Sequence, residues 1–173
     1  KYFSNAYPIV SIDLQMDREE ALEKAQDLAH KYNWGPADFE QAAVFRLDRE
    51  VQNFVELEHG GAERFGQMIK GPLYSPYTWK IRHYKAGETN ETIVRFSPEG
   101  TPYGFQEKLP EDQPGPSLNS NSALSIAKTR AKDDYSIDFK DFKLLERSHE
   151  VQPEGRTDHS FVFERKDTTI GKG

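Results

Sequence analysis

Histidine and carboxylate side chains are the groups in this sequence that could carry acid–base or metal chemistry. The five histidines are His30, His59, His83, His149 and His159. None lies in an HExxH helix, the spacing with which two histidines bind zinc on one helix face. His83 is expected on a strand with Glu107 about two strands away, and His149 and His159 flank one predicted hairpin. We interpret all five as ordinary polar-face histidines, and we predict no metal site and no cofactor.

Signatures of nucleophilic catalysis and of phosphate binding are missing from the sequence. Ser11, Ser75 and Ser117 do not lie in the GxSxG elbow that exposes a hydrolase nucleophile. Gly60 and Gly61 are followed by Ala-Glu-Arg, which matches neither the P-loop nor the GxGxxG fingerprint. The chain has no cysteine, which excludes thiol catalysis, disulfides and cysteine-bound zinc. Because 29 residues are acidic, a pair chosen for glycosidase chemistry has no specificity. We predict no catalytic residue in this segment.

An aromatic group is the pattern that points to a binding surface. Its members are Tyr74, Tyr77, Trp79, Tyr84 and Tyr103. Aromatic side chains with polar tips are enriched at binding surfaces, so these five are our candidate binding residues for a peptide or a partner domain. In the alternative, which we favour, Trp79 packs under the first helix and the tyrosines cover the edge of the core.

Three predicted strands between Gly71 and Pro110 position this aromatic group. Residues 77–84 and 91–96 alternate apolar and polar side chains, the period of two expected of strands with one buried face. A third strand is predicted over 103–109, and both connecting turns contain glycine.

A helix is predicted before these strands, over residues 18–32. Asp17 and Glu20 form a capping-box pattern, and apolar residues then recur at three- and four-residue spacing. An edge strand is expected in the apolar patch from Ile9 to Leu14. Two further elements lie between the helix and the central strands. Residues 43–47 and 51–57 predict a hairpin, and residues 62–69 predict a short helix with Phe65, Met68 and Ile69 pointing inward.

The pattern of the first helix returns after a segment rich in proline, glycine and serine. Ala123, Leu124, Ala127 and Ala131 repeat the order and spacing of Ala21, Leu22, Ala25 and Ala29. Residues 161–164 echo 54–57 after a hairpin through 153–155. We predict an α+β fold of two tandem helix-plus-antiparallel-meander units, each a two-layer sandwich, with the second unit truncated. Residues 1–110 form the first unit, 111–122 the linker and 123–173 the second unit.

Composition limits the partners of the chain. The net charge of −6 and scattered basic residues disfavour nucleic acid and anionic lipid, which both need clustered positive charge. No run of 18 or more apolar residues is present, so the sequence predicts no membrane span. We expect an excised segment of a longer protein, with its targeting information outside the segment.

The run LYSPYTWKIRHYKAGETNETIVRFSPEGTPYGFQEKLPED resembles the amino-terminal, extracytoplasmic region of bacterial CPBP (CAAX-protease-like, abortive-infection-type) intramembrane metalloproteases. The similarity extends from DREEALEKA to DHSFVFERKDTTIGKG. It implies a tethered module outside the membrane, beside a transmembrane protease. The catalytic motifs of that family do not carry over, because Lys24 stands where EExxxR requires arginine and no FxxxH occurs. The helix-plus-meander pattern is also similar to PepSY and cystatin-like modules.

The sequence therefore predicts a noncatalytic extracytoplasmic binding or regulatory module of a membrane-embedded protease. Its partner would be a peptide, another protein or the transmembrane domain of its own parent, and extended peptides would bind along a sheet edge. Two alternatives stay open. One is a free-standing hydrolase or metal enzyme built around His83 or the hairpin of His149 and His159, and the other is a structural spacer domain.

Overall fold

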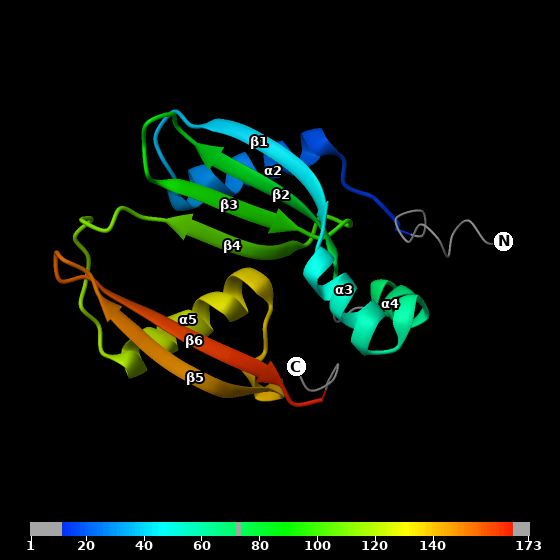
Figure 1. Ribbon diagram of the computed structural model, residues 1–173. Coiled ribbons are helices and arrows are strands. Elements are labelled where there is room, and N and C mark those ends of the chain that lie inside the picture. The colour runs from blue at the N-terminus through cyan, green and yellow to red at the C-terminus, as the bar shows by residue number, and fades with distance from the viewer. Residues whose placement is uncertain (1–11, 72–73, 168–173) are drawn as a thin grey trace. The chain divides into compact units, whose positions relative to one another are not determined.

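The computed structural model describes residues 12–71 and 74–167 of the chain, which divides into two compact units (Figure 1). Unit 1 is Lys1–Lys108 and unit 2 is Leu109–Gly173. The fold is α+β with antiparallel sheets, as predicted, and in each unit a helix precedes the described strands. Ile9 and Val10 of the expected edge strand lie outside the described residues. Residues 12–14 are described and are not in a strand, so that part of the expectation is wrong.

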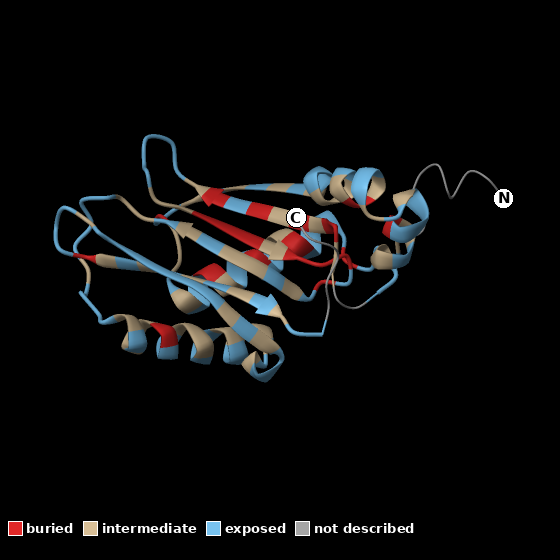
Figure 2. Ribbon diagram, turned by 60° about the horizontal axis from the view of Figure 1, so that its bottom comes forward, coloured by how far each residue is buried: buried red, intermediate tan, exposed pale blue. Residues whose placement is uncertain are grey.

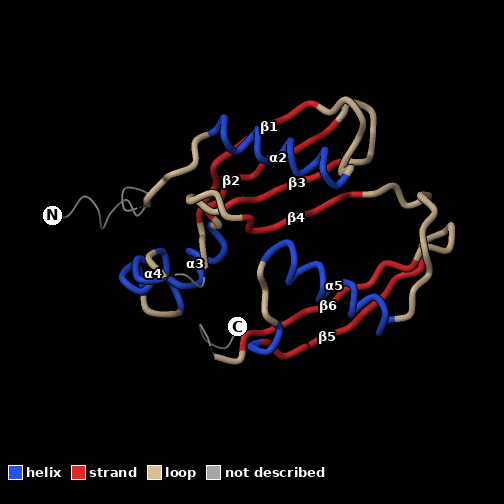
Figure 3. Tube along the Cα trace, turned by 180° about the vertical axis from the view of Figure 1, so that it is seen from behind, coloured by secondary structure: helices blue, strands red, loops and turns tan. Residues whose placement is uncertain are grey.

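Unit 1 is a helix packed on a four-stranded sheet. Its elements are α2 (Arg18–Tyr32), β1 (Glu40–Leu47), α3 (Arg49–Glu58), α4 (Gly61–Ile69), β2 (Tyr77–Tyr84), β3 (Glu91–Phe96) and β4 (Pro102–Lys108). The strands are antiparallel in the order β1-β2-β3-β4, and α2 lies against β1 and β2 (Figure 3). This two-layer arrangement is the predicted one.

The capping box predicted for α2 is present. Asp17 Oδ1 accepts hydrogen bonds from the backbone N–H of Glu19 at 2.8 Å and of Glu20 at 2.9 Å, and Glu20 Oε2 accepts from Asp17 N–H at 3.2 Å. The helix ends at Asn33, which has a φ of 55° in the left-handed region. Satisfied N-terminal donors and a left-handed C-cap fix both ends of this helix.

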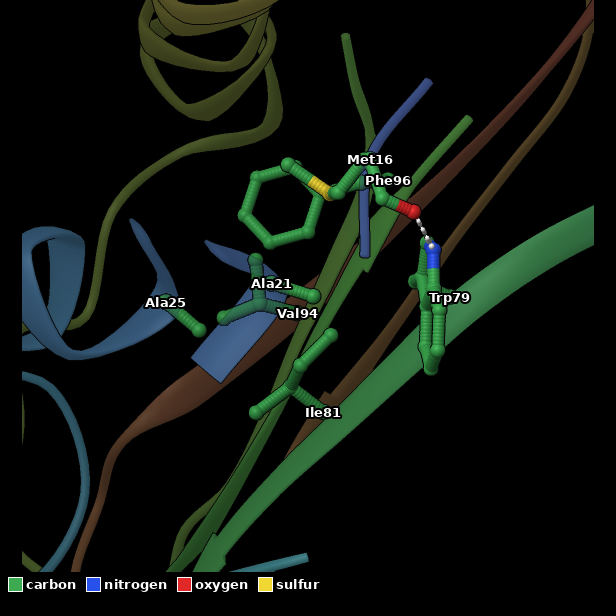
Figure 4. Packing of buried hydrophobic residues seen from close by; sticks show 7 residues of the cluster. All are labelled: Met16, Ala21, Ala25, Trp79, Ile81, Val94 and Phe96. Atoms are coloured by element: carbon green, nitrogen blue, oxygen red, sulfur yellow. Dashed lines mark hydrogen bonds between the residues drawn. The ribbon is translucent and has the colours of Figure 1, made fainter. Parts of the chain in front are cut away.

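The core of unit 1 lies between α2 and the sheet. Figure 4 shows its buried cluster: Met16, Ala21, Ala25, Trp79, Ile81, Val94 and Phe96. The alanines of α2 let the helix approach the strands closely, while β2 and β3 contribute the large side chains. Alternate residues of β2 are buried (Figure 2), as the period of two predicts.

The prediction of a second strand at residues 51–57 is wrong, because these residues belong to α3. Val51, Val55 and Leu57 fit strand alternation, whereas Val51, Phe54 and Val55 fit helical spacing. The Asp48 side chain accepts from Val51 N–H at 3.2 Å as the helix N-cap. Val55 is fully buried, whereas Leu57 is 83% exposed; a strand would have placed both on one face. The partner of β1 is therefore β2, and α3 and α4 are inserted between them. The predicted helix with Phe65 buried is α4.

Unit 2 is shorter and, in its described residues, places a helix before an antiparallel pair of strands, without the two helices that separate β1 from β2 in unit 1. It has α5 (Ser120–Tyr135), the one-turn helix η2 (Phe139–Asp141), β5 (Phe142–Val151) and β6 (Thr157–Arg165). The proposed echo of 54–57 in 161–164 is wrong, because the former is helical. By order in the chain, β5 corresponds to β1 and β6 to β2.

The predicted linker at 111–122 differs from the structure in two ways. Residues 120–122 already belong to α5, whose N-cap is Asn119. The preceding residues pack on the hairpin through Arg156, which is 9% exposed and donates from Nη1 to the carbonyls of Pro110 at 2.9 Å and Gln113 at 3.0 Å. A Cβ on Gly115 would lie 2.8 Å from Arg156 Cδ, so this position needs glycine. A buried arginine thus supplies the donors that the irregular backbone requires.

Candidate binding surface

The sheet face of unit 1 that points away from α2 is the candidate binding surface, here called the open face. Residues on β2 alternate, so Thr78, Lys80, Arg82 and Tyr84 lie on the open face, and Tyr77, Trp79, Ile81 and His83 lie on the buried one. The open face is not apolar throughout. It combines Val44, which is 47% exposed, with five basic side chains, namely Arg46, Lys80, Arg82, Arg95 and Lys108.

Strand register brings three of these basic residues together. Lys80 is directly opposite Val44 on β1 and Arg95 on β3. Directly opposite residues have Cβ atoms about 4.5–5.5 Å apart, so Lys80 and Arg95 are immediate neighbours. Arg46 lies two residues beyond Val44 on the same face and is the diagonal neighbour of Lys80. We call Arg46, Lys80 and Arg95 the cationic cluster.

The charges of the cationic cluster are not balanced by ion pairs within the described chain. The pKa of Lys80 is lowered, first because burial disfavours the charged form and then because Arg95 and Arg46 are positive; the negative charge of Glu91 acts in the opposite direction without reversing the shift. No described carboxylate lies within salt-bridge distance of any of the three. Sequence reasoning took the basic residues to be scattered. The register of three strands brings these three into one cluster.

At the other end of the open face, the basic side chain of Arg82 is paired with a carboxylate. Arg82 forms an ion pair with Glu91, with Nε 2.7 Å from the carboxylate, and its guanidinium lies 4.7 Å from the centre of the Tyr84 ring. The Tyr84 hydroxyl donates to Glu40 Oε2 at 3.3 Å. Tyr84, one of the predicted binding residues, therefore lies on the open face beside charged groups that already have partners.

Tyr77 and Trp79 lie on the buried face of the sheet. Trp79 is 7% exposed, and its Nε1 donates to the Met16 carbonyl at 3.0 Å (Figure 4). Tyr77 stacks on Phe45 with 6.0 Å between ring centres. Trp79 thus packs under the first helix, as in the alternative that the sequence left open.

Tyr74 and Tyr103 are held near the start of α3. The Tyr74 hydroxyl donates to Asp48 Oδ2 at 2.9 Å, and the Tyr103 hydroxyl accepts from Ser75 N–H at 3.3 Å. Burial raises the pKa of both phenols, and in Tyr74 the bond to the Asp48 carboxylate raises it further. Both phenols therefore stay protonated at neutral pH, and they tie the residues before β2 to α3 and β4.

The prediction that His83 is a polar-face histidine is wrong, because it lies in the interior of unit 1 with both ring nitrogens engaged. Gln41 Nε2 is 2.9 Å from His83 Nε2 and 3.2 Å from the Leu22 carbonyl, and Thr92 Oγ1 is 3.4 Å from His83 Nδ1. Phe39 stacks on the imidazole at 4.1 Å. Glu107 is two strands away, as expected, and its Oε1 accepts from Gly35 N–H at 3.1 Å. These contacts give His83 a packing role.

The histidines of unit 2 form a cross-strand pair. The rings of His149 and His159 are opposite each other with centres 5.9 Å apart, and His159 Nε2 is 2.9 Å from the Leu118 carbonyl. Within the described residues, no group of three or more histidine, aspartate and glutamate side chains has an arrangement suited to a metal ion.

Comparison with known proteins identified no relative of this chain. No protein-family model, curated protein or solved structure matches this chain. In the described part of the chain, no helix combines the length and the apolar character needed to cross a membrane.

Proposed function

We propose that this chain is a noncatalytic binding module that recognises a polypeptide partner on the open face of unit 1. The observation that carries this proposal is the contrast between the two faces of one sheet. One face is filled by α2 and the buried cluster, whereas the other presents Val44, Tyr84 and basic side chains. Partly exposed apolar and aromatic groups among long cationic stems are suited to a protein surface.

The noncatalytic part of the proposal rests on what the reactive side chains do. His83 is buried with neutral partners, Glu107 holds the turn at Gly35, and His159 bonds a backbone carbonyl. Each of these groups has a structural role. Among the described residues, the one hydroxyl beside these groups is that of Thr92, 3.4 Å from His83 Nδ1, and both residues are fully buried, so this contact does not present a nucleophile to a substrate.

The cellular setting in this proposal rests on the resemblance to the CPBP family. In that setting the module lies on the extracytoplasmic side of a membrane-embedded protease and regulates access to it, and its partner is a substrate peptide or the parent's own transmembrane domain. The full-length gene product provides the check: it should contain hydrophobic spans that carry EExxxR and FxxxH motifs.

Amide chemical shifts of the isotope-labelled chain test the binding proposal. The probes are the detergent-solubilised remainder of the full-length gene product and a pool of random-sequence peptides. We expect the shifted amides to gather around residues 42–46, 78–84 and 91–95. Val44→Ser should reduce the response severalfold, because it removes exposed apolar area from the open face.

Leu57→Ser is the matched control, because Leu57 is also an exposed aliphatic residue but lies on α3. It should leave the response unchanged. No amide response to either probe, or a response that Val44→Ser and Leu57→Ser weaken equally, would show that the open face does not bind polypeptides.

A further inference from the structure

The cationic cluster combines two features that are unfavourable in an isolated sheet. Lys80 and Arg95 are like charges directly opposite each other, an arrangement that destabilises paired strands. Arg46 adds a third positive charge on the diagonal. The chain carries 29 acidic residues, yet no described one forms an ion pair with this cluster. The three positive charges therefore repel one another without a paired carboxylate among the described residues, and an external anion would reduce this repulsion.

Short side chains flank Lys80 and Arg95 on the neighbouring strands. Arg95 is opposite Gly104 on β4, and its Nη1 lies 3.9 Å from the position of a Cβ on that glycine. Val44 lies beside Lys80 on the other side. The row therefore has a short side chain or none at each end, and Lys80 and Arg95 between them are partly exposed.

The spacing of Arg46 and Lys80 matches an extended polypeptide. Diagonal neighbours on adjacent strands are about 7–8 Å apart, which describes Arg46 and Lys80. In an extended chain, residues i and i+2 point to the same side and lie about 6.8 Å apart. Carboxylates at alternate positions of a bound segment could therefore meet Arg46 with one group and the adjacent pair Lys80 and Arg95 with the next.

We propose that the cationic cluster binds an acidic, extended segment of a partner protein with aspartate or glutamate at alternate positions. This inference rests on the proposed function and specifies the chemistry of the partner. A protein segment is favoured over a membrane or a nucleic acid because the positive patch is small and bordered at one end by Glu40 and Glu91, and because the chain as a whole has a charge of −6. A long polyanion would meet that surrounding negative charge.

The test uses the full chain and two synthetic peptides of about ten residues, long enough to cross the sheet. One has glutamate at alternate positions, and the other has glutamine there. We expect the glutamate peptide to shift the amides of Arg46, Lys80 and Arg95, with an affinity that falls as NaCl rises from about 0.05 to about 0.5 M. Lys80→Gln and Arg95→Gln should each weaken binding about fivefold, as the loss of one partly exposed charge contact does.

Lys70→Gln is the control, because Lys70 is an exposed cation of unit 1 outside the sheet. It should leave the affinity unchanged. Equal binding of both peptides, or equal weakening by all three variants, contradicts the assignment.

Two further probes separate other anions from an acidic segment. Vesicles with about one third phosphatidylglycerol that bind through Lys80 and Arg95, in the absence of peptide binding, would assign the cluster to a membrane surface. Inorganic phosphate that shifts the same amides as strongly as the peptide would reduce it to a site for single anions. If random peptides or the parent protein bind the open face but the glutamate peptide does not, this inference fails and the proposed function stands. If no polypeptide binds, both fail.

Discussion

His83 is an imidazole with no contact with solvent, and its hydrogen bonds fix the position of its proton. Gln41 donates one amide hydrogen to the Leu22 carbonyl, so the second faces His83 Nε2, which must accept it. The ring proton then lies on Nδ1, toward Thr92 Oγ1. A second proton on Nε2 would face the Gln41 amide hydrogen. This geometry is consistent with a neutral ring.

The protonation of His83 predicts acid sensitivity of unit 1. Burial, and then the neighbouring His30, lower the pKa of His83 from 6.5 to about 4. The unfolded chain therefore binds a proton more readily than the folded chain between these two values, and stability is lost as the pH falls through that window. We expect the free energy of unfolding to fall by about 3 kcal/mol between pH 6.5 and pH 4 from this group.

Unfolding in urea at several pH values, followed by tryptophan fluorescence, measures this effect. Both tryptophans, Trp34 and Trp79, belong to unit 1, so the signal reports that unit within the full chain. His83→Gln cannot titrate and should flatten the pH dependence, whereas the exposed His30→Gln should retain most of it. If the His83 variant does not fold, an NMR titration of the His83 ring in the wild-type chain tests the prediction instead. A pKa near 6.5 for this ring would contradict it.

At the scale of elements, α3 provides a direct test of helix against strand. Val55 is fully buried and Leu57 is 83% exposed, although an alternating strand would place the two on one face. Val55→Ala should lower the free energy of unfolding by about 2 kcal/mol, because it leaves a cavity in a packed site. Leu57→Ala should change it by less than about 0.5 kcal/mol. Urea unfolding of the two variants measures both values, and equal losses would support the strand instead.

Local signals made most elements of unit 1 predictable. The start of α2 depends on Asp17 and Glu20, three residues apart, and β2 and β3 depend on alternation within each strand. The α3 segment was missed because its apolar residues fit both periods, and the N-cap at Asp48 was not taken into account. Short apolar runs are ambiguous for this reason.

The candidate site was less predictable than the fold because it depends on register. Alternation in β2 shows that Lys80 and Arg82 share a face, but only the pairing of β1, β2 and β3 shows that Lys80 meets Arg95 while Arg82 is neutralised by Glu91. Arg156 in unit 2 was missed for a similar reason, since its partners at Pro110 and Gln113 are distant in the chain. Sequence alone ranked aromatic residues above these cations.

At the scale of the whole molecule, the boundary near residue 108 predicts that unit 1 folds without unit 2. The buried cluster of unit 1 and the hydrophobic side chains packed against it come from residues 16–105. A unit that contains its own core should fold alone. We therefore expect residues 1–108, produced without unit 2, to unfold in one cooperative transition with a urea midpoint within roughly 15% of the full chain.

A shorter fragment is the control for this prediction. Residues 1–96 lack β4, and with it Phe105, whose ring stacks on Trp34 with 3.8 Å between centres. Its removal also exposes the hydrogen-bonding edge of β3 and removes Glu107, which holds the turn at Gly35. We expect this fragment to lose the cooperative tryptophan transition. If residues 1–108 behave like residues 1–96, unit 1 needs more of the chain to fold, and the boundary near residue 108 does not mark an independent folding unit.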